Sequence, residues 1–238
     1  MTDKRWIQLG GLAGIIYVAA SLVGEFIAPS SPNLNASIAT ITAYFTGHRH
    51  AVMAGQIIMA GGFAFALWWL GTLGHTFGKL GERRDPLGWI AVTAGVASAT
   101  LALVSNSPMT LLAILAAQPN GLANGPVVRA VFDLPPIFGG VSLVLFAAFA
   151  SSLGIGAARR GMVGSWLGWL GFVVGIAAGV GGGAQLALGG PSAMNTVYTA
   201  GLIGFAIVVL ILSVQMLRGR TAIGPKGNEG EFVPSELG

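Results

Sequence analysis

Cysteine is absent from this chain of 238 residues. Its absence excludes disulfides, iron–sulfur clusters, thiolate metal sites and lipoprotein anchors. Charged residues are scarce as well, at 8%, whereas soluble domains carry about a quarter. A chain in which 54% of the residues are hydrophobic cannot cover a water-facing surface with so few charges. We therefore expect an integral membrane protein whose solvent is lipid.

The short motifs of common enzymes are also missing. The chain has no H-E-x-x-H, no P-loop and no G-x-S-x-G sequence. Its histidines are poorly placed for haem or a metal, because His48 and His50 are two residues apart and would face different directions on a helix. His75 is predicted at the other membrane face, and an outer zinc site with Glu25 has no further support. We expect no catalytic residue, no metal site and no cofactor.

The hydrophobic runs predict an all-α fold, a polytopic membrane protein with six transmembrane helices. The first run follows Lys4 and Arg5 and has the length of a full span, so we interpret it as uncleaved, with signal-peptide cleavage after Ala20 as the alternative. One six-helix domain would occupy residues 1–220, and a disordered cytoplasmic tail would follow at 221–238. The predicted spans are about 6–27, 52–73, 88–106, 134–158, 165–186 and 197–217.

Short interfacial helices are predicted on one side of the membrane. In residues 34–45, apolar side chains recur at spacings of four, three and four, which places them on one helix face. Asn33 or Asn35 could cap the start of this helix, which is too short to span the membrane. Residues 127–132 are a further short segment on the same side.

Pro108 interrupts the third hydrophobic run, which is too long for one straight span. The residue before a proline disfavours the helical conformation. We therefore expect span 3 to end near Asn106. A separate helix over 108–116 would then begin with Ser107 as its cap.

The distribution of Lys and Arg predicts the orientation. Ten of these residues lie at the termini and in the loops between spans 2 and 3 and spans 4 and 5, and two, Arg49 and Arg129, lie on the opposite side. Basic residues accumulate on the cytoplasmic side of membrane proteins. We expect both termini in the cytoplasm, and a location in the inner (plasma) membrane.

Isolated polar side chains gather near the outer ends of the predicted spans. Ionisable residues inside a membrane are costly and suggest function, so we take this set as a candidate ligand-binding site. Structural roles are the alternatives: Asp133 as the N-cap of span 4, an Arg129–Asp133 ion pair, an arginine partner for Glu25, and interhelical hydrogen bonds from the glutamines. The candidate residues are Glu25, Gln56, Asn106, Arg129, Asp133 and Gln185.

Glycines recur every four residues in the fifth span, at Gly171, Gly175, Gly179 and Gly183. Such a series lies on one helix face and allows a neighbouring helix to approach closely.

Three segments carry a resemblance to known proteins: TAYFTGHRHAVMAGQ, RAVFDL and ARRGMVGSWLGWLGFVVG. Over roughly Ile7 to Arg218 the chain resembles a bacterial, often actinobacterial, family of multi-pass membrane proteins of unknown function. This resemblance implies the topology and no activity.

Two functions remain as hypotheses. The first is a non-enzymatic membrane protein that binds or moves a small molecule or lipid at the outer polar site. The second is an assembly subunit that packs against a membrane protein partner, or a second copy of itself, through the glycine face. The basic residues are juxtamembrane and give no pattern for nucleic acid.

Overall fold

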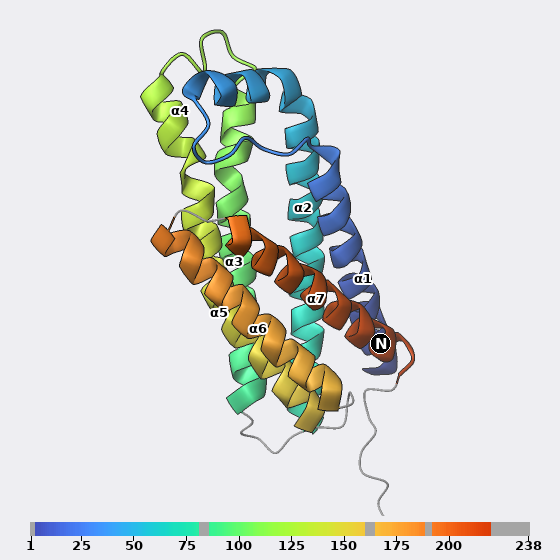
Figure 1. Cartoon of the computed structure of the whole chain (residues 1–238). Coiled ribbons are helices and arrows are strands. Elements are labelled where there is room, and N and C mark those ends of the chain that lie inside the picture. Colours follow the sequence, from blue (N-terminus) through green and yellow to red (C-terminus); the bar gives the residue numbers. More distant parts are fainter. Residues whose placement is uncertain (1–2, 81–85, 160–164, 189–191, 220–238) are drawn as a thin grey trace, which may run out of the picture.

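The computed structural model describes residues 3–80, 86–159, 165–188 and 192–219, and the predicted tail at 221–238 lies outside them (Figure 1). These residues form helices and no strand. The helices are α1 Asp3–Ile27, α2 Ile38–Leu80, α3 Pro86–Leu115, α4 Gly125–Phe132, α5 Leu134–Arg159, α6 Ser165–Leu188 and α7 Ser192–Leu217.

Six helices are long and apolar enough to cross a membrane, which confirms the predicted all-α, six-span fold. Only α4 is too short to span, at 8 residues. The predicted interfacial helix and the second span are a single helix, α2, of 43 residues. In Figure 1 its first turns lie across the end of the bundle before the helix turns to run along it. Near this bend the Thr46 hydroxyl donates to the Thr42 carbonyl at 2.8 Å, a bond that tends to bend helices.

The predicted caps in this region were wrong. Asn33 and Asn35 do not cap α2. Ser37 does, because its hydroxyl accepts a hydrogen bond from the Thr40 amide at 3.2 Å. Asn33 instead accepts a backbone bond from Ala36, which closes a turn before the helix.

The break predicted at Pro108 was also wrong, because α3 continues through this proline. The proline lacks the N–H that would bond to the Val104 carbonyl, and the helix continues without that bond. Ser107, predicted as a cap, instead donates its hydroxyl to the Leu103 carbonyl at 3.2 Å, and the Thr110 hydroxyl donates to the Asn106 carbonyl at 3.4 Å. Pro108 itself is buried against its neighbours, so tertiary packing outweighs its local preference.

The six long helices form a closed ring. Each contacts the next in the order α1, α2, α3, α5, α6 and α7, and α7 returns to α1. The interior is filled by apolar side chains from all six helices, with Trp69 and Leu73 of α2 and Phe149 of α5 among the most buried. Phe146, Phe149 and Phe205 stack edge to face, with centroids 4.5–5.9 Å apart.

A second apolar core lies at the end of the ring where α4 and the first turns of α2 meet, which we call the capped end (Figure 1). Ile41 and Phe45 of α2 are fully buried there, together with Leu112 of α3 and Val128 of α4. The face of residues 34–45 that was predicted to be apolar is covered at Ile41 and Phe45, whereas Ile38 on the same face is 40% exposed. The chain's own helices cover much of this face, which was expected to lie along the membrane interface.

The glycine series packs α6 against α5 inside the chain. A β-carbon on Gly175 would lie 2.9 Å from the Ala147 carbonyl oxygen, and one on Gly171 would lie 3.0 Å from the α-carbon of Gly154. A β-carbon on Gly179 would lie 2.8 Å from the Ala147 β-carbon, whereas one on Gly183 would have no described atom within 4 Å. Because α5 already covers this face, it is not free to hold a partner chain, and the assembly hypothesis loses the surface on which it was based.

A reciprocal serine pair joins α3 to α5. The Ser98 hydroxyl donates to the Ser142 carbonyl at 3.0 Å, and the Ser142 hydroxyl donates to the Ser98 carbonyl at 2.9 Å. We expect Ser98→Ala and Ser142→Ala each to cost about 0.6 kcal/mol, the average for such bonds between membrane helices. Thermal unfolding in detergent would measure this, and a double variant no worse than either single one would contradict it.

Candidate functional site

Arg129 joins α4 to the segment between α1 and α2. Its Nε donates to a carboxylate oxygen of Asp133 at 2.8 Å, and its Nη1 donates to the Ala36 carbonyl at 3.0 Å. Its Nη2 makes a short hydrogen bond to the Leu34 carbonyl. The predicted Arg129–Asp133 pair is therefore present, and the guanidinium is engaged on three sides. Its geometry is that of a structural brace at the capped end.

Asp133 does not cap α5, although capping was one of the predicted roles. An N-cap carboxylate accepts from the amides two and three residues later, and here those residues are Pro135 and Pro136, which have no N–H. Asp133 instead ends α4, and its own amide bonds back to Arg129 and Val131. Its carboxylate is left for the guanidinium of Arg129. The start of α4 is capped by Asn124, which accepts from the Val127 amide at 3.3 Å.

Glu25 and Gln56 lie at one level of the bundle. Gly24 of α1 packs directly on Gly55 of α2, since a β-carbon on Gly24 would lie 2.8 Å from the Gly55 carbonyl oxygen. The two helices run in opposite directions (Figure 1). Glu25 and Gln56 each follow one of these glycines, and one residue along an α-helix is a rotation of about 100° about the helix axis. Because the two helices are antiparallel, these rotations bring Glu25 and Gln56 to the same side of the helix pair.

These two side chains differ from Arg129 in having no partner. Glu25 is exposed, and no hydrogen bond or ion pair among the described residues involves it, so the predicted arginine partner is not found there. The Gln56 side-chain oxygen is buried and accepts no hydrogen bond in this part of the chain. A buried acceptor without a donor is costly, so this atom is one that a bound donor would stabilise.

The remaining predicted residues are less informative. Asn106 is half-buried within α3, at the level of the Ser105 hydroxyl bond to the Pro135 carbonyl at 3.3 Å, and so close to the start of α5. The prediction that span 3 ends near Asn106 was wrong, because α3 continues past this residue to Leu115. Gln185 lies in α6, but its side chain falls outside the described residues. The structure thus brings together Arg129 with Asp133, and Glu25 with Gln56, as two separate pairs.

Two further buried polar atoms were missed by the sequence analysis. The indole nitrogen of Trp69 and the hydroxyl of Ser213 have no hydrogen-bond partner among the described residues, and their side chains are 1% and 0% exposed. Both lie against Gly14, whose β-carbon, if present, would clash with each of them. A tryptophan and a serine in apolar runs are indistinguishable from ordinary span residues, so no sequence signal indicated that they converge.

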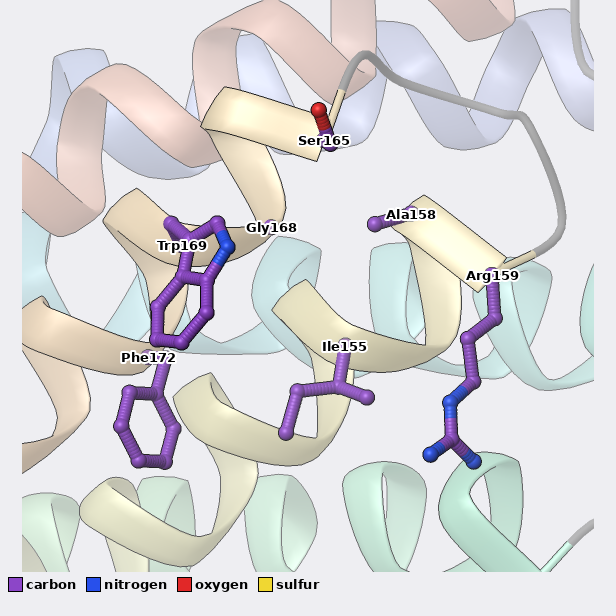
Figure 2. A pocket seen from close by; sticks show the side chains of 7 residues that line it. All are labelled: Ile155, Ala158, Arg159, Ser165, Gly168, Trp169 and Phe172. Carbon is purple, nitrogen blue, oxygen red and sulfur yellow. The ribbon is translucent and has the colours of Figure 1, made fainter.

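A cavity of about 320 Å³ lies at the opposite end of the bundle, between α5 and α6 (Figure 2). None of the predicted site residues lines it. Its walls are the side chains of Ile155, Ala158, Arg159, Ser165, Trp169 and Phe172, with Gly168 at its base.

No group of three or more histidine, aspartate or glutamate residues within the described ranges is placed to hold a metal ion. His75 pairs with Asp3, at 3.7 Å between nitrogen and oxygen, and His50 accepts from its neighbour Arg49 at 3.1 Å. Comparisons of the chain with protein-family models, with curated proteins and with solved structures found no match. Any function must therefore be inferred from the geometry.

Proposed function

We propose that this chain is a non-enzymatic membrane protein that binds an amine-bearing small molecule or lipid headgroup at the capped end, through Glu25 and Gln56. The observation that carries the proposal is the buried, unpartnered oxygen of Gln56 on the same side of the α1–α2 pair as the unpaired carboxylate of Glu25. The Gln56 oxygen and the Glu25 carboxylate both accept hydrogen bonds, so the ligand they fit is a donor. An ammonium group supplies N–H donors and a compensating positive charge.

The packed interior of the ring supports binding over passage. The apolar core draws side chains from all six spanning helices, and a polar solute would have to displace them to cross. Arg129 and Asp133 are no longer ligand residues in this proposal, because their charges are satisfied by one another and by the carbonyls of Leu34 and Ala36.

The orientation proposed from the basic residues determines the side of the membrane on which the proposed site lies. With both termini in the cytoplasm, the capped end faces outward from a bacterial plasma membrane, and the site would take its ligand from the outer side. A membrane partner or a second copy remains a secondary proposal, and it would have to use a face other than the glycine series.

Glu25→Gln should weaken binding of an amine headgroup about tenfold, the loss expected for one charge-assisted hydrogen bond. The measurement is native mass spectrometry of the full chain released from nanodiscs of phosphatidylethanolamine or phosphatidylcholine, the latter having no N–H donor. Gln56→Leu should lower retention of phosphatidylethanolamine as well. Free butylamine should compete if the amine alone is recognised.

Asp3→Asn is the matched control, because it removes an exposed carboxylate at the other end of the bundle. It should leave retention unchanged. Equal retention of the two lipids by the unaltered chain, together with no effect of butylamine, would overturn the proposal.

A further inference from the structure

The cavity between α5 and α6 has almost wholly apolar walls, and Arg159 lies at its edge. Trp169 and Phe172 of α6 meet edge to face, with ring centroids 5.8 Å apart, and Ile155 of α5 lines the cavity with them. Figure 2 shows the two aromatic side chains on one side, Ile155 in the middle, and the Arg159 side chain, at the end of α5, on the other side. An apolar space with a basic residue at its edge fits an amphiphile better than a water-soluble ion.

The cavity exists because small residues hold the two helices close together at its base. A β-carbon on Gly168 would lie 2.5 Å from the Ala158 β-carbon and 2.9 Å from the Gly154 carbonyl oxygen. The helices therefore touch there, and the larger side chains of Trp169 and Arg159 stand on either side of the contact. The space is a fixed consequence of backbone packing, and a ligand need not open it.

The guanidinium of Arg159 is available for an anion. Its side chain is exposed, and no hydrogen bond or ion pair among the described residues involves it. A guanidinium binds phosphate through two parallel N–H donors. Ser165, the first residue of α6, lines the same cavity, but its hydroxyl points away from this guanidinium (Figure 2).

The position in the bundle suits a lipid. Trp169 is 67% exposed and Trp166 is 63% exposed, and tryptophans of this kind mark the boundary between the acyl chains and the headgroups. Arg159 is the last residue of the spanning helix α5, and it lines the same cavity as Trp169. Basic pockets between transmembrane helices bind anionic headgroups.

We propose that the α5–α6 cavity is a binding site for one anionic phospholipid of the surrounding bilayer. Its phosphate contacts Arg159, and its glycerol and upper acyl chains lie on Ile155, Trp169 and Phe172. This site is distinct from the one at the capped end, differs from it in the sign of its charge, and does not depend on it.

The test is the number of lipids retained by the full chain in native mass spectrometry after release from nanodiscs of equal parts phosphatidylglycerol and phosphatidylethanolamine. The unaltered chain should retain phosphatidylglycerol in preference. Arg159→Gln should lower this preference about fivefold, the effect of one cation close to an anionic membrane surface. Arg159→Lys should keep most of it, and Trp169→Ala should lower retention without removing the charge.

Arg5→Gln is the matched control, since Arg5 is an exposed basic residue at the same end but on α1. Its preference should equal that of the unaltered chain. A loss as large as that of Arg159→Gln would show diffuse attraction to the basic end and overturn the site. Full competition by millimolar inorganic phosphate would overturn it too, because it would show that the apolar walls contribute nothing. Neither outcome would bear on the capped-end proposal, which is tested by its own experiment.

Discussion

Replacing Gly175 with leucine should lower the thermal unfolding temperature of the detergent-solubilised protein by about 10 °C. The contact between α5 and α6 at Gly175 has no room even for a β-carbon, which would lie 2.5 Å from the Ser151 hydroxyl and 2.9 Å from the Ala147 carbonyl oxygen. Backbone cannot move aside as a flexible side chain can, so α5 and α6 must separate. Overpacking of this kind costs about 3 kcal/mol, and 1 kcal/mol shifts the midpoint by about 3 °C in a chain of this size.

Gly183→Leu is the control within the same four-residue series. No atom of the described residues lies within 4 Å of a β-carbon at this position, so we expect a change of less than about 0.5 kcal/mol. Size-exclusion chromatography of both variants would add a second reading. If Gly175→Leu left the unfolding temperature unchanged and instead split a dimer, the series would be an interface between chains, against the packing described above.

Arg129→Met should loosen the capped end by about 3 kcal/mol. The substitution keeps the length and apolar character of the stem, but it removes the donors to Ala36 and Leu34 as well as the ion pair with Asp133. A hydrogen bond from a charged donor contributes about 1.5–3 kcal/mol. Hydrogen exchange of the amides in residues 33–40 and in α4 should accelerate, while exchange in the ring core stays as it is.

Asp133→Asn separates the two contributions. It removes the charge of the ion pair and leaves the carbonyl bonds, and the pair is partly exposed, with Arg129 33% and Asp133 43% accessible. Such pairs contribute less than about 1 kcal/mol. An effect of Asp133→Asn as large as that of Arg129→Met would mean that the ion pair, and not the clamp on the carbonyls, holds α4 in place.

Hydropathy was sufficient to predict the six spans because each lipid-facing helix must be apolar over its full length. It failed at the helix ends. Residues 38–80 form one helix although polar Arg49 and His50 interrupt the apolar run. The first turns of α2 at the capped end and the spanning part of α2 are both supported by tertiary contacts. Pro108 was misread for the same reason, since a rule for isolated backbone ignores the tertiary packing in which this residue is buried.

The candidate site shows where periodicity stops being informative. A glycine series predicts a close approach but not which helix makes it, and here that helix is α5. The common depth of Glu25 and Gln56 was predictable from span boundaries, whereas their common side depends on the Gly24–Gly55 contact. The α5–α6 cavity had no sequence signal, because its walls are ordinary interface residues brought together by Gly168 and Ala158.

The contact between α1 and α7 has a consequence for biogenesis. Gly11 of α1 packs against Ser213 of α7, the last of the described helices in order of synthesis. If helices enter the membrane in the order in which they are made, this side of α1 is covered only after the other described spans have been inserted. Until then Gly11 offers a surface that another helix with small residues can occupy. The first and last of the described helices must therefore meet before the ring of spans can close.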